Sequence, residues 1–241
     1  MTTLIKITVS AILALLMTSC NFDMNWVGVK GNGNVITKER TLNGTFNEIK
    51  ISRGLDVYLT QSATESIEVQ ADENLHDIII TKIEGNVLKI YADENISYSS
   101  AQKVMVNFEN ISRISATSGS DVFSTNLITV KDLELKVTSG SDMELEINTE
   151  TVDCKSTSGA DLKLSGSTNQ LFAESTSGSD IDAGDLIANT CNAKATSGSE
   201  IIVNAKEKLY ASTSSGADIT YYGKPNKLEK SEGVSSKISK R

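Results

Sequence analysis

The sequence is poor in the residues on which many helical, disulfide-linked and nucleic-acid-binding proteins depend. It has one proline, one histidine, three cysteines and 5% aromatic residues in 241 positions. Three cysteines cannot build a disulfide framework. The 31 acidic residues outnumber the 23 basic ones, for a formal charge of −8, which argues against nucleic-acid binding because phosphate contacts need clustered Lys and Arg. The chain carries no motif that predicts a cofactor, so we expect neither a cofactor nor a dedicated metal centre.

The residues that are abundant are small and polar. Serine, threonine, glycine and asparagine recur throughout the chain, while 39% of the residues are apolar. This apolar content argues against a wholly disordered chain. Short strands joined by glycine turns fit the composition better than a large helical core does. We therefore predict an all-β protein.

The amino terminus has the pattern of a bacterial lipoprotein signal. Residues 1–19 contain a single charge and an apolar run that is too short to span a bilayer. The run ends at Met17-Thr18-Ser19-Cys20, which resembles a lipobox. We predict a signal peptide over residues 1–19, acyl chains on Cys20, and a tether over residues 20–30. The acyl chains would hold the protein on a membrane of the cell envelope, the outer membrane, facing the periplasm or the surface. The alternative is ordinary secretion with Cys20 as an unmodified thiol.

A Thr-Ser-Gly-x-Asp motif recurs six times after residue 112. It reads Thr117-Ser118-Gly119-Ser120-Asp121 in the first copy and Ser214-Ser215-Gly216-Ala217-Asp218 in the last. The motif glycines follow one another at intervals of 18 to 21 residues: Gly119, Gly140, Gly159, Gly178, Gly198 and Gly216. Arg53-Gly54-Leu55-Asp56 resembles a seventh, degenerate copy. A near-constant period of this length indicates a repeat architecture.

Polar and apolar positions alternate on both sides of each motif glycine. The positions seven and five residues before the glycine, and three and five after it, are mostly apolar, whereas those between them are mostly polar. Alternation at period two on both sides of a turn indicates a strand, a corner and a second strand. We predict a right-handed parallel β-helix over residues 112–223, with coils of about 20 residues. Leucine-rich repeats and calcium-binding β-rolls need motifs that this chain lacks.

Cys154 and Cys191 fall at apolar positions of coils that lie two apart. Parallel strands stack about 4.8 Å apart, so the two α-carbons should be roughly 9 to 10 Å apart, beyond the roughly 7 Å limit for a disulfide. We predict two buried free thiols.

The last motif position places one acidic residue in every coil. Stacking aligns these residues in a column: Asp121, Asp142, Asp161, Asp180, Glu200 and Asp218, with Asp56 as a candidate seventh member. Like charges about 4.8 Å apart repel by roughly 1 kcal/mol in water, so something must offset the repulsion. One interpretation is structural, with corner amides and hydroxyls donating hydrogen bonds to the carboxylates. The other is functional: the column binds cations, or meets a basic or hydroxyl-rich ligand. Acid and base catalysis is disfavoured, because it needs carboxylates in different environments.

The segments on either side of the repeats follow less regular patterns. Residues 31–111 alternate as strands, with turn signals at Asn43-Gly44 and Glu84-Gly85-Asn86, so we predict an irregular N-terminal β region. Terminal coils are expected to differ from central ones because their strand edges must be protected. The single His76 is expected on the surface or in a turn. Residues 224–241 are rich in Lys and Ser and are predicted to form a basic C-terminal tail.

Several segments together resemble one protein family. They are the lipobox, the opening Gly33-Asn34-Val35-Ile36-Thr37, the stretches 46–61 and 71–75, the repeated corners, and the closing Tyr222-Gly223-Lys224-Pro225. In combination, over about residues 31–225, they resemble the DUF2807 family, the auto-transporter adhesin head GIN domain proteins common in Bacteroidetes. The resemblance implies a β-helical, secreted or lipid-anchored protein with a role in adhesion. It brings no catalytic residues.

Three kinds of function are open to such a chain. The first, which we favour, is a lipid-anchored binding or adhesion module that contacts glycans, envelope components or other proteins through its hydroxyl and carboxylate ladders. The second is a β-helical carbohydrate-active enzyme, a polysaccharide lyase or hydrolase, which would need clustered, nonequivalent polar groups and aromatic platforms. The third is a purely structural component of the envelope.

Overall fold

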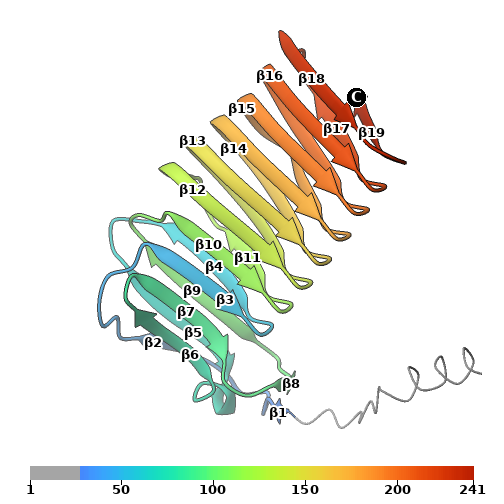
Figure 1. Cartoon of the computed structure of the whole chain (residues 1–241). Helices are drawn as coiled ribbons and strands as arrows, with labels where there is room; N and C mark the ends of the chain where they lie inside the picture. The colour runs from blue at the N-terminus through green and yellow to red at the C-terminus, as the bar shows by residue number, and fades with distance from the viewer. Residues whose placement is uncertain (1–27) are drawn as a thin grey trace, which may run out of the picture.

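The computed structural model describes residues 28–241, which form a β-solenoid (Figure 1). Seventeen strands join into one continuous sheet that winds around a single core, and a separate short pair is formed by β1 (Val29–Lys30) and β8 (Ile96–Tyr98). The predicted all-β fold with stacked parallel coils is confirmed. No helix within residues 28–241 is long and apolar enough to cross a membrane. The predicted signal peptide, Cys20 and most of the tether lie outside the described residues.

The regular part of the solenoid is built from long strands separated by the repeated corners. Its strands are β10 (Arg113–Thr117), β11 (Asp121–Ser124), β12 (Ile128–Thr138), β13 (Asp142–Thr157), β14 (Asp161–Thr176), β15 (Asp180–Thr196), β16 (Glu200–Ser214) and β17 (Asp218–Tyr222). The segment before each corner pairs in parallel with the segment before the next corner, and the segments after the corners pair likewise. We call the surface formed by the segments before the corners face A, and the surface formed by those after the corners face B.

Each corner turns the chain through two consecutive residues in the left-handed backbone region. In the second copy these are Ser139, with φ of 60°, and Gly140, with φ of 65°, and the other copies repeat the pair. Glycine adopts this conformation without steric cost, which explains its recurrence. The amide of Gly140 donates to the carbonyl of Ser158 in the next coil, so the hydrogen-bonded ladder continues across the corner.

The opposite bend of each coil lies inside a long strand. In β13 the buried side chains are Met143, Leu145, Ile147 and Thr149, and the alternation then slips by one residue before it resumes at Val152. This slip keeps the apolar side chains inside while the chain passes from face B to face A. The buried Thr149 hydroxyl donates to that of Thr168 in the next coil at 2.9 Å, which satisfies polar groups at the bend.

The core is a stack of apolar columns, one residue per coil in each column. Ile114, Leu135, Cys154 and Ala173 form one such column in successive coils. Cys154 and Cys191 are both free and buried, as predicted, and they belong to different columns of coils that lie two apart. Burial raises the pKa of the Cys154 thiol, and that of Cys191 to about 12, so both thiols behave as small apolar side chains.

The N-terminal region adds one further coil and then caps the stack with antiparallel strands. Strands β3 (Glu48–Ser52) and β4 (Asp56–Gln61) pair in parallel with β10 and β11, and the corner between them is Arg53-Gly54, both with positive φ. Beyond them, β7 (Val87–Ala92) and β9 (Gln102–Phe108) extend the two faces. The outermost strands β2 (Val35–Arg40), β5 (Ser66–Asp72) and β6 (Ile79–Glu84) are antiparallel to their neighbours. The turn predicted at Glu84-Gly85-Asn86 joins β6 and β7 in a hairpin.

A buried carboxylate fastens this cap together. Asp72 is fully buried and accepts hydrogen bonds from the backbone amides of Gly33, Ser100 and Ala101. It therefore ties two loops to the end of β5, close to β1. Charge-assisted bonds of this kind are among the stronger ones in proteins.

His76 lies in a turn, as expected, but it is not on the surface. It follows the 3-10 helix η1 (Glu73–Leu75) and is only 2% exposed. Its Nε2 lies 3.1 Å from the Ile36 carbonyl and its Nδ1 lies 3.5 Å from the Arg40 guanidinium. Nε2 therefore donates and Nδ1 accepts. The side chain is buried because the antiparallel cap places β2 over it. This contact joins segments 36 residues or more apart, and the repeat does not predict it.

The predicted C-terminal tail is instead a last coil of the solenoid. Strands β18 (Lys227–Glu232) and β19 (Lys237–Lys240) pair in parallel with β16 and β17. Ile238 covers Ile219 of the core, and the Lys230 ammonium lies 4.7 Å from the Tyr221 ring and donates to the Ile238 carbonyl. The segment orders because it covers the open end of the core. Its lysines remain on the free strand edge, where charge discourages pairing with other chains.

Candidate functional site

The repeated corners form a ridge along one side of the solenoid, where the loops lie one above another (Figure 1). Each of the six motif copies contributes a Thr or Ser before the turn, an exposed Ser and Gly within it, and an acidic residue after it. The threonines stand in register, and the Thr196 hydroxyl donates to that of Thr176 at 2.9 Å. The ridge therefore presents unbroken rows of hydroxyls beside a row of carboxylates.

All six predicted acidic residues stand in one register, and Asp56 joins them as the seventh. The column, which we call the acidic ladder, is Asp56, Asp121, Asp142, Asp161, Asp180, Glu200 and Asp218. A lysine occupies the next register position beyond each end of the ladder: Lys103 lies beside Asp56, and Lys237 lies beside Asp218. Neither lysine could be assigned from the repeat, since both lie on strands without the corner motif.

The electrostatics of the ladder show the expected repulsion. Partial burial raises the pKa of Asp56, Asp121, Asp142 and Asp161, and the neighbouring carboxylates raise it further in the last three. At Asp56 the Lys103 ammonium acts in the opposite direction. Burial first, and crowding by neighbouring carboxylates second, thus disfavour the charged form at these positions, and the lysine opposes the effect at the N-terminal end.

Backbone amides offset part of the repulsion. The amide of Glu200 donates to Asp180 Oδ1 at 3.1 Å, and the amide of Lys237 donates to Asp218 Oδ1 at 3.0 Å. Each of these two carboxylates receives its bond from the residue at the same register position in the next coil. Within residues 28–241 no three His, Cys, Asp or Glu side chains lie close enough to hold one metal ion, so the ladder is a single file and not a chelating cluster.

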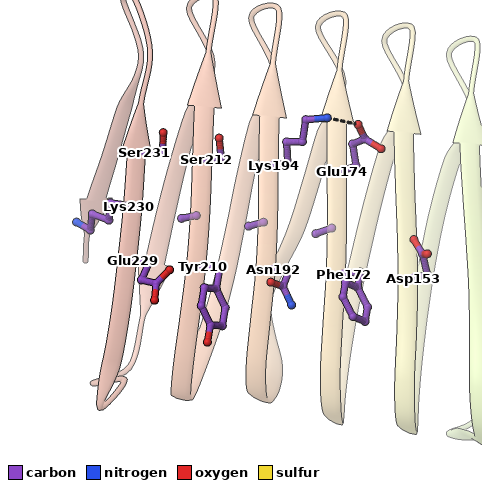
Figure 2. A pocket seen from close by; sticks show the side chains of 13 residues that line it. Asp153, Phe172, Glu174, Asn192, Lys194, Tyr210, Ser212, Glu229, Lys230 and Ser231 are labelled. Carbon is purple, nitrogen blue, oxygen red and sulfur yellow. Dashed lines mark hydrogen bonds and ion pairs between the residues drawn. The ribbon is translucent and has the colours of Figure 1, made fainter.

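A second feature, which sequence reasoning missed, is a shallow groove on face A near the C-terminal end (Figure 2). It has a volume of about 550 Å³, and its floor includes Ala173, Ala193 and Ala211 of three successive coils. One wall is a row of five side chains: Asp153, Phe172, Asn192, Tyr210 and Glu229. The other wall is formed by Glu174, Lys194, Ser212 and Ser231. We call this groove the trough.

The aromatic side chains of the trough point outward from a regular strand surface, with Phe172 exposed and Tyr210 half-buried. Asn192 on β15 pairs with Phe172 on β14 on one side and with Tyr210 on β16 on the other. Phe172 is 39% exposed, and the Lys227 ammonium lies 5.0 Å from the centre of the Tyr210 ring. The sequence carried a signal for this site, because Phe172 and Tyr210 are the aromatic members of an otherwise polar, outward-facing column.

The two carboxylates at one end of the trough have pKa values shifted in opposite directions. Hydrogen bonds from Lys194 and Lys155, each 3.0 Å long, lower the pKa of Glu174. Partial burial raises the pKa of Asp153, and repulsion from Glu134 and Glu174 adds to the effect. These two acids therefore have different environments, unlike the members of the ladder.

Comparison with known proteins places this architecture in a family. One family model matches residues 45–225, and its description reads "Putative auto-transporter adhesin, head GIN domain". The chain belongs to the DUF2807 family. The DUF2807 match spans the whole acidic ladder but ends before β18 and β19, so Glu229, Lys230 and Ser231 of the trough lie beyond it. No curated protein matches the chain.

Solved structures of other proteins share the fold of this DUF2807 chain. A putative adhesin from Bacteroides fragilis NCTC 9343 has a TM-score of 0.82 at 22% identity, covering 89% of this chain and all of its own (100%). A putative lipid binding protein from Parabacteroides distasonis ATCC 8503 has a TM-score of 0.71 at 22% identity, covering 88% and 99%. A putative adhesin from Parabacteroides merdae ATCC 43184 has a TM-score of 0.70 at 20% identity, covering 88% and 98%. At such identities the likeness shows the fold alone.

Proposed function

We propose that the protein is an adhesin-like binding module of the cell envelope, held to the membrane by acyl chains on Cys20, with no catalytic activity. The observation that carries the proposal is the set of in-register rows of outward-facing side chains on a parallel sheet, among them the ridge and the trough. Such surfaces suit contact with extended ligands, either glycans or envelope proteins. The description of the DUF2807 family supports the same role.

Anchoring is tested by labelling and fractionation. Cells expressing the full chain are grown with an alkyne-tagged fatty acid, and the protein is expected to carry the label and to sediment with the outer membrane. A Cys20→Ser variant should lose both properties, whereas a Cys191→Ser variant should keep them because that thiol is buried in the core. An unlabelled wild-type protein released into the medium would contradict the anchor. Protease added to intact cells then tells whether the module faces the surface or the periplasm.

Binding is tested with the chain that begins after Cys20. The purified protein is presented to a glycan array and to envelope proteins separated from the same cells. We expect saturable binding to at least one component, which an unrelated acidic β-protein of similar charge does not show. Absence of saturable binding to either set would leave the third function, a structural envelope component, as the better account.

The acidic ladder is the second contact surface in this proposal, for cations or a basic ligand. Its support is the mutual repulsion of carboxylates, which a bound cation would relieve. Calcium at millimolar concentration should then raise the melting temperature of the wild-type protein. The triple variant Asp142→Asn, Asp161→Asn, Asp180→Asn should show no calcium effect. If the wild-type melting temperature does not respond to calcium, the cation-binding role of the ladder is contradicted.

One observation favours a second function, a carbohydrate-active enzyme. Asp153 and Glu174 at the trough have oppositely shifted pKa values, the difference expected of an acid and a base that cleave a glycosidic bond. Against it, both side chains stand on an open sheet surface and Glu174 is held by two lysines. The test is release of reducing ends from oligosaccharides that bind: turnover lost in Asp153→Asn with binding retained would establish the enzyme.

A further inference from the structure

The trough differs from the rest of face A in the chemistry of one outward-facing column. Toward the N-terminus this column is charged and internally paired, because Arg113 bonds to both Glu48 and Glu134. In β14, β15 and β16 the same column becomes Phe172, Asn192 and Tyr210. An exposed phenylalanine beside an amide and a tyrosine gives the surface an uncharged stretch with both apolar faces and hydrogen-bonding groups.

The spacing of the two aromatic rings is set by the sheet. Phe172 and Tyr210 each pair with Asn192, so they lie two coils apart, which is about 9.6 Å between α-carbons at the usual strand spacing. A sugar ring has an apolar face of C–H groups and a rim of hydroxyls, and one ring occupies about one coil. Two rings of a linear glycan can therefore lie over Phe172 and Tyr210, with a third ring between them. The Asn192 amide, which can donate and accept, faces the hydroxyls of that middle ring.

The floor and the opposite wall of the trough supply space for a stacked sugar ring and hydrogen-bonding groups for its hydroxyls. The side chains of Ala173, Ala193 and Ala211 are buried in the core, so only strand backbone lies between the two outward-facing rows and a flat ring can approach the sheet there. The opposite wall offers the Glu174 carboxylate, the Lys194 ammonium and the Ser212 hydroxyl (Figure 2). These groups donate and accept hydrogen bonds along the far rim of each ring. A wall that carries two aromatic rings thus faces a polar wall across a shallow floor, an arrangement that suits an amphipathic chain.

The charge of the trough selects a neutral glycan over a polyanion. Its lining includes three acids, Asp153, Glu174 and Glu229, against two lysines. Both lysines are already engaged: Lys194 with Glu174, and Lys230 with the Ile238 carbonyl. A polyanionic chain would therefore meet net negative charge and no uncommitted cation along this lining.

We propose that the trough binds a neutral, linear polysaccharide whose chain runs along the solenoid axis, across the strands. This assignment rests on the proposed binding function and names its site and ligand class. From Asp153 to Glu229 the trough spans five coils, about 19 Å at the usual strand spacing. It therefore accommodates about four or five sugar rings, and affinity should rise with chain length up to that size.

The test is calorimetric titration of the mature protein with neutral oligosaccharides. The probes are hexasaccharides of β-1,4-glucose, β-1,4-mannose, β-1,4-xylose and α-1,4-glucose, with polygalacturonate as the anionic comparison. We expect at least one neutral hexasaccharide to bind, with an affinity that salt leaves unchanged. Phe172→Ala and Tyr210→Ala should each weaken it about tenfold or more, as loss of an aromatic anchor does. Phe172→Tyr and Tyr210→Phe should retain binding, and their retention shows that the ring is the group that matters.

The matched control is Phe123→Ala on face B. Phe123 is also an outward-facing aromatic, stacked on Tyr58 with ring centres 5.4 Å apart, and its removal should leave glycan binding unchanged. Melting temperatures confirm that each variant is folded. The proposal is overturned if no neutral hexasaccharide binds, if polygalacturonate binds instead, or if both alanine variants bind as the wild type does. Envelope binding that survives in Phe172→Ala and Tyr210→Ala would overturn the trough as the site while leaving the adhesin-like function intact.

Discussion

The acidic ladder should cost the folded protein stability at neutral pH, and Asp161→Asn measures that cost. Asp161 stands between Asp142 and Asp180 in the register, and its pKa is raised by partial burial and, in addition, by both neighbours. Removing its charge relieves two repulsions. At about 4.8 Å in water each is worth about 0.9 kcal/mol, so the sum is about 1.7 kcal/mol. The carboxylates are largely exposed and screened, which lowers the expected gain to about 0.5–1 kcal/mol.

The assay is urea unfolding followed by circular dichroism at several pH values. A raised pKa means that the folded protein binds protons more readily than the unfolded chain, so the wild type regains ladder stability as the pH falls through the folded-state pKa. The advantage of Asp161→Asn should therefore be largest at pH 7 and disappear below the ordinary aspartate value of 3.8. It should also shrink in 1 M salt, where the screening length is about 3 Å.

Glu150→Gln is the matched control, because it removes one exposed negative charge at the opposite bend, away from the ladder. Its effect should stay within about 0.5 kcal/mol at every pH. Two results would refute the reasoning. One is a destabilised Asp161→Asn, which would show that the carboxylate accepts bonds worth more than the repulsion. The other is a gain equal to that of Glu150→Gln and independent of salt, which would show that only net charge matters.

The remaining predictions concern the N-terminal cap and the bends. Asp72→Asn should lower the free energy of unfolding by about 2 kcal/mol or more, because a fully buried carboxylate that accepts three backbone amides loses its charge; an unchanged urea midpoint would contradict that role. Gly140→Ala should cost about 1 kcal/mol, from φ alone, since an added Cβ meets nothing within 4 Å. Gly166→Ala should cost clearly more, because its Cβ would collide with the Ile147 carbonyl. Equal losses in the two glycine variants would show that the bend at Gly166 can relax.

The regular coils could be predicted from the sequence because each residue's partner is another copy of the same motif. The spacing of the motif glycines predicts that Asp121 lies opposite Asp142 and that Cys154 and Cys191 stay apart, and both predictions follow from the parallel register. A corner that needs two left-handed residues in succession accepts few sequences, so it recurs almost unchanged. The period of the sequence is thus the period of the structure.

The two ends could not be predicted in the same way, because their partners carry no shared motif. His76 is buried by β2, and Asp72 is held by loops that lie 28 residues or more away in the chain. At the other end, the last corner has Ser235 in place of the motif glycine, and Lys237 in place of the acid. The sequence of this segment therefore predicts a basic tail, although Ile238 occupies a core column. A terminal coil needs apolar residues at the core positions in order to cover the end of the stack. It does not need the Thr-Ser-Gly-x-Asp motif at its corner.

The ladder and the trough also differ in what repetition implies about function. A column that keeps the same kind of residue in successive coils meets a structural need that those coils share. In the acidic ladder that need is an acidic residue directly after a corner with two left-handed residues. The column that holds Phe172, Asn192 and Tyr210 changes its chemistry in a few coils only. Such a change indicates a requirement that is specific to those coils. The core beneath does not require the change, because these side chains point outward. A ligand that contacts three successive coils accounts for it, and this makes the trough, more than the conspicuous ladder, the first place to look for recognition.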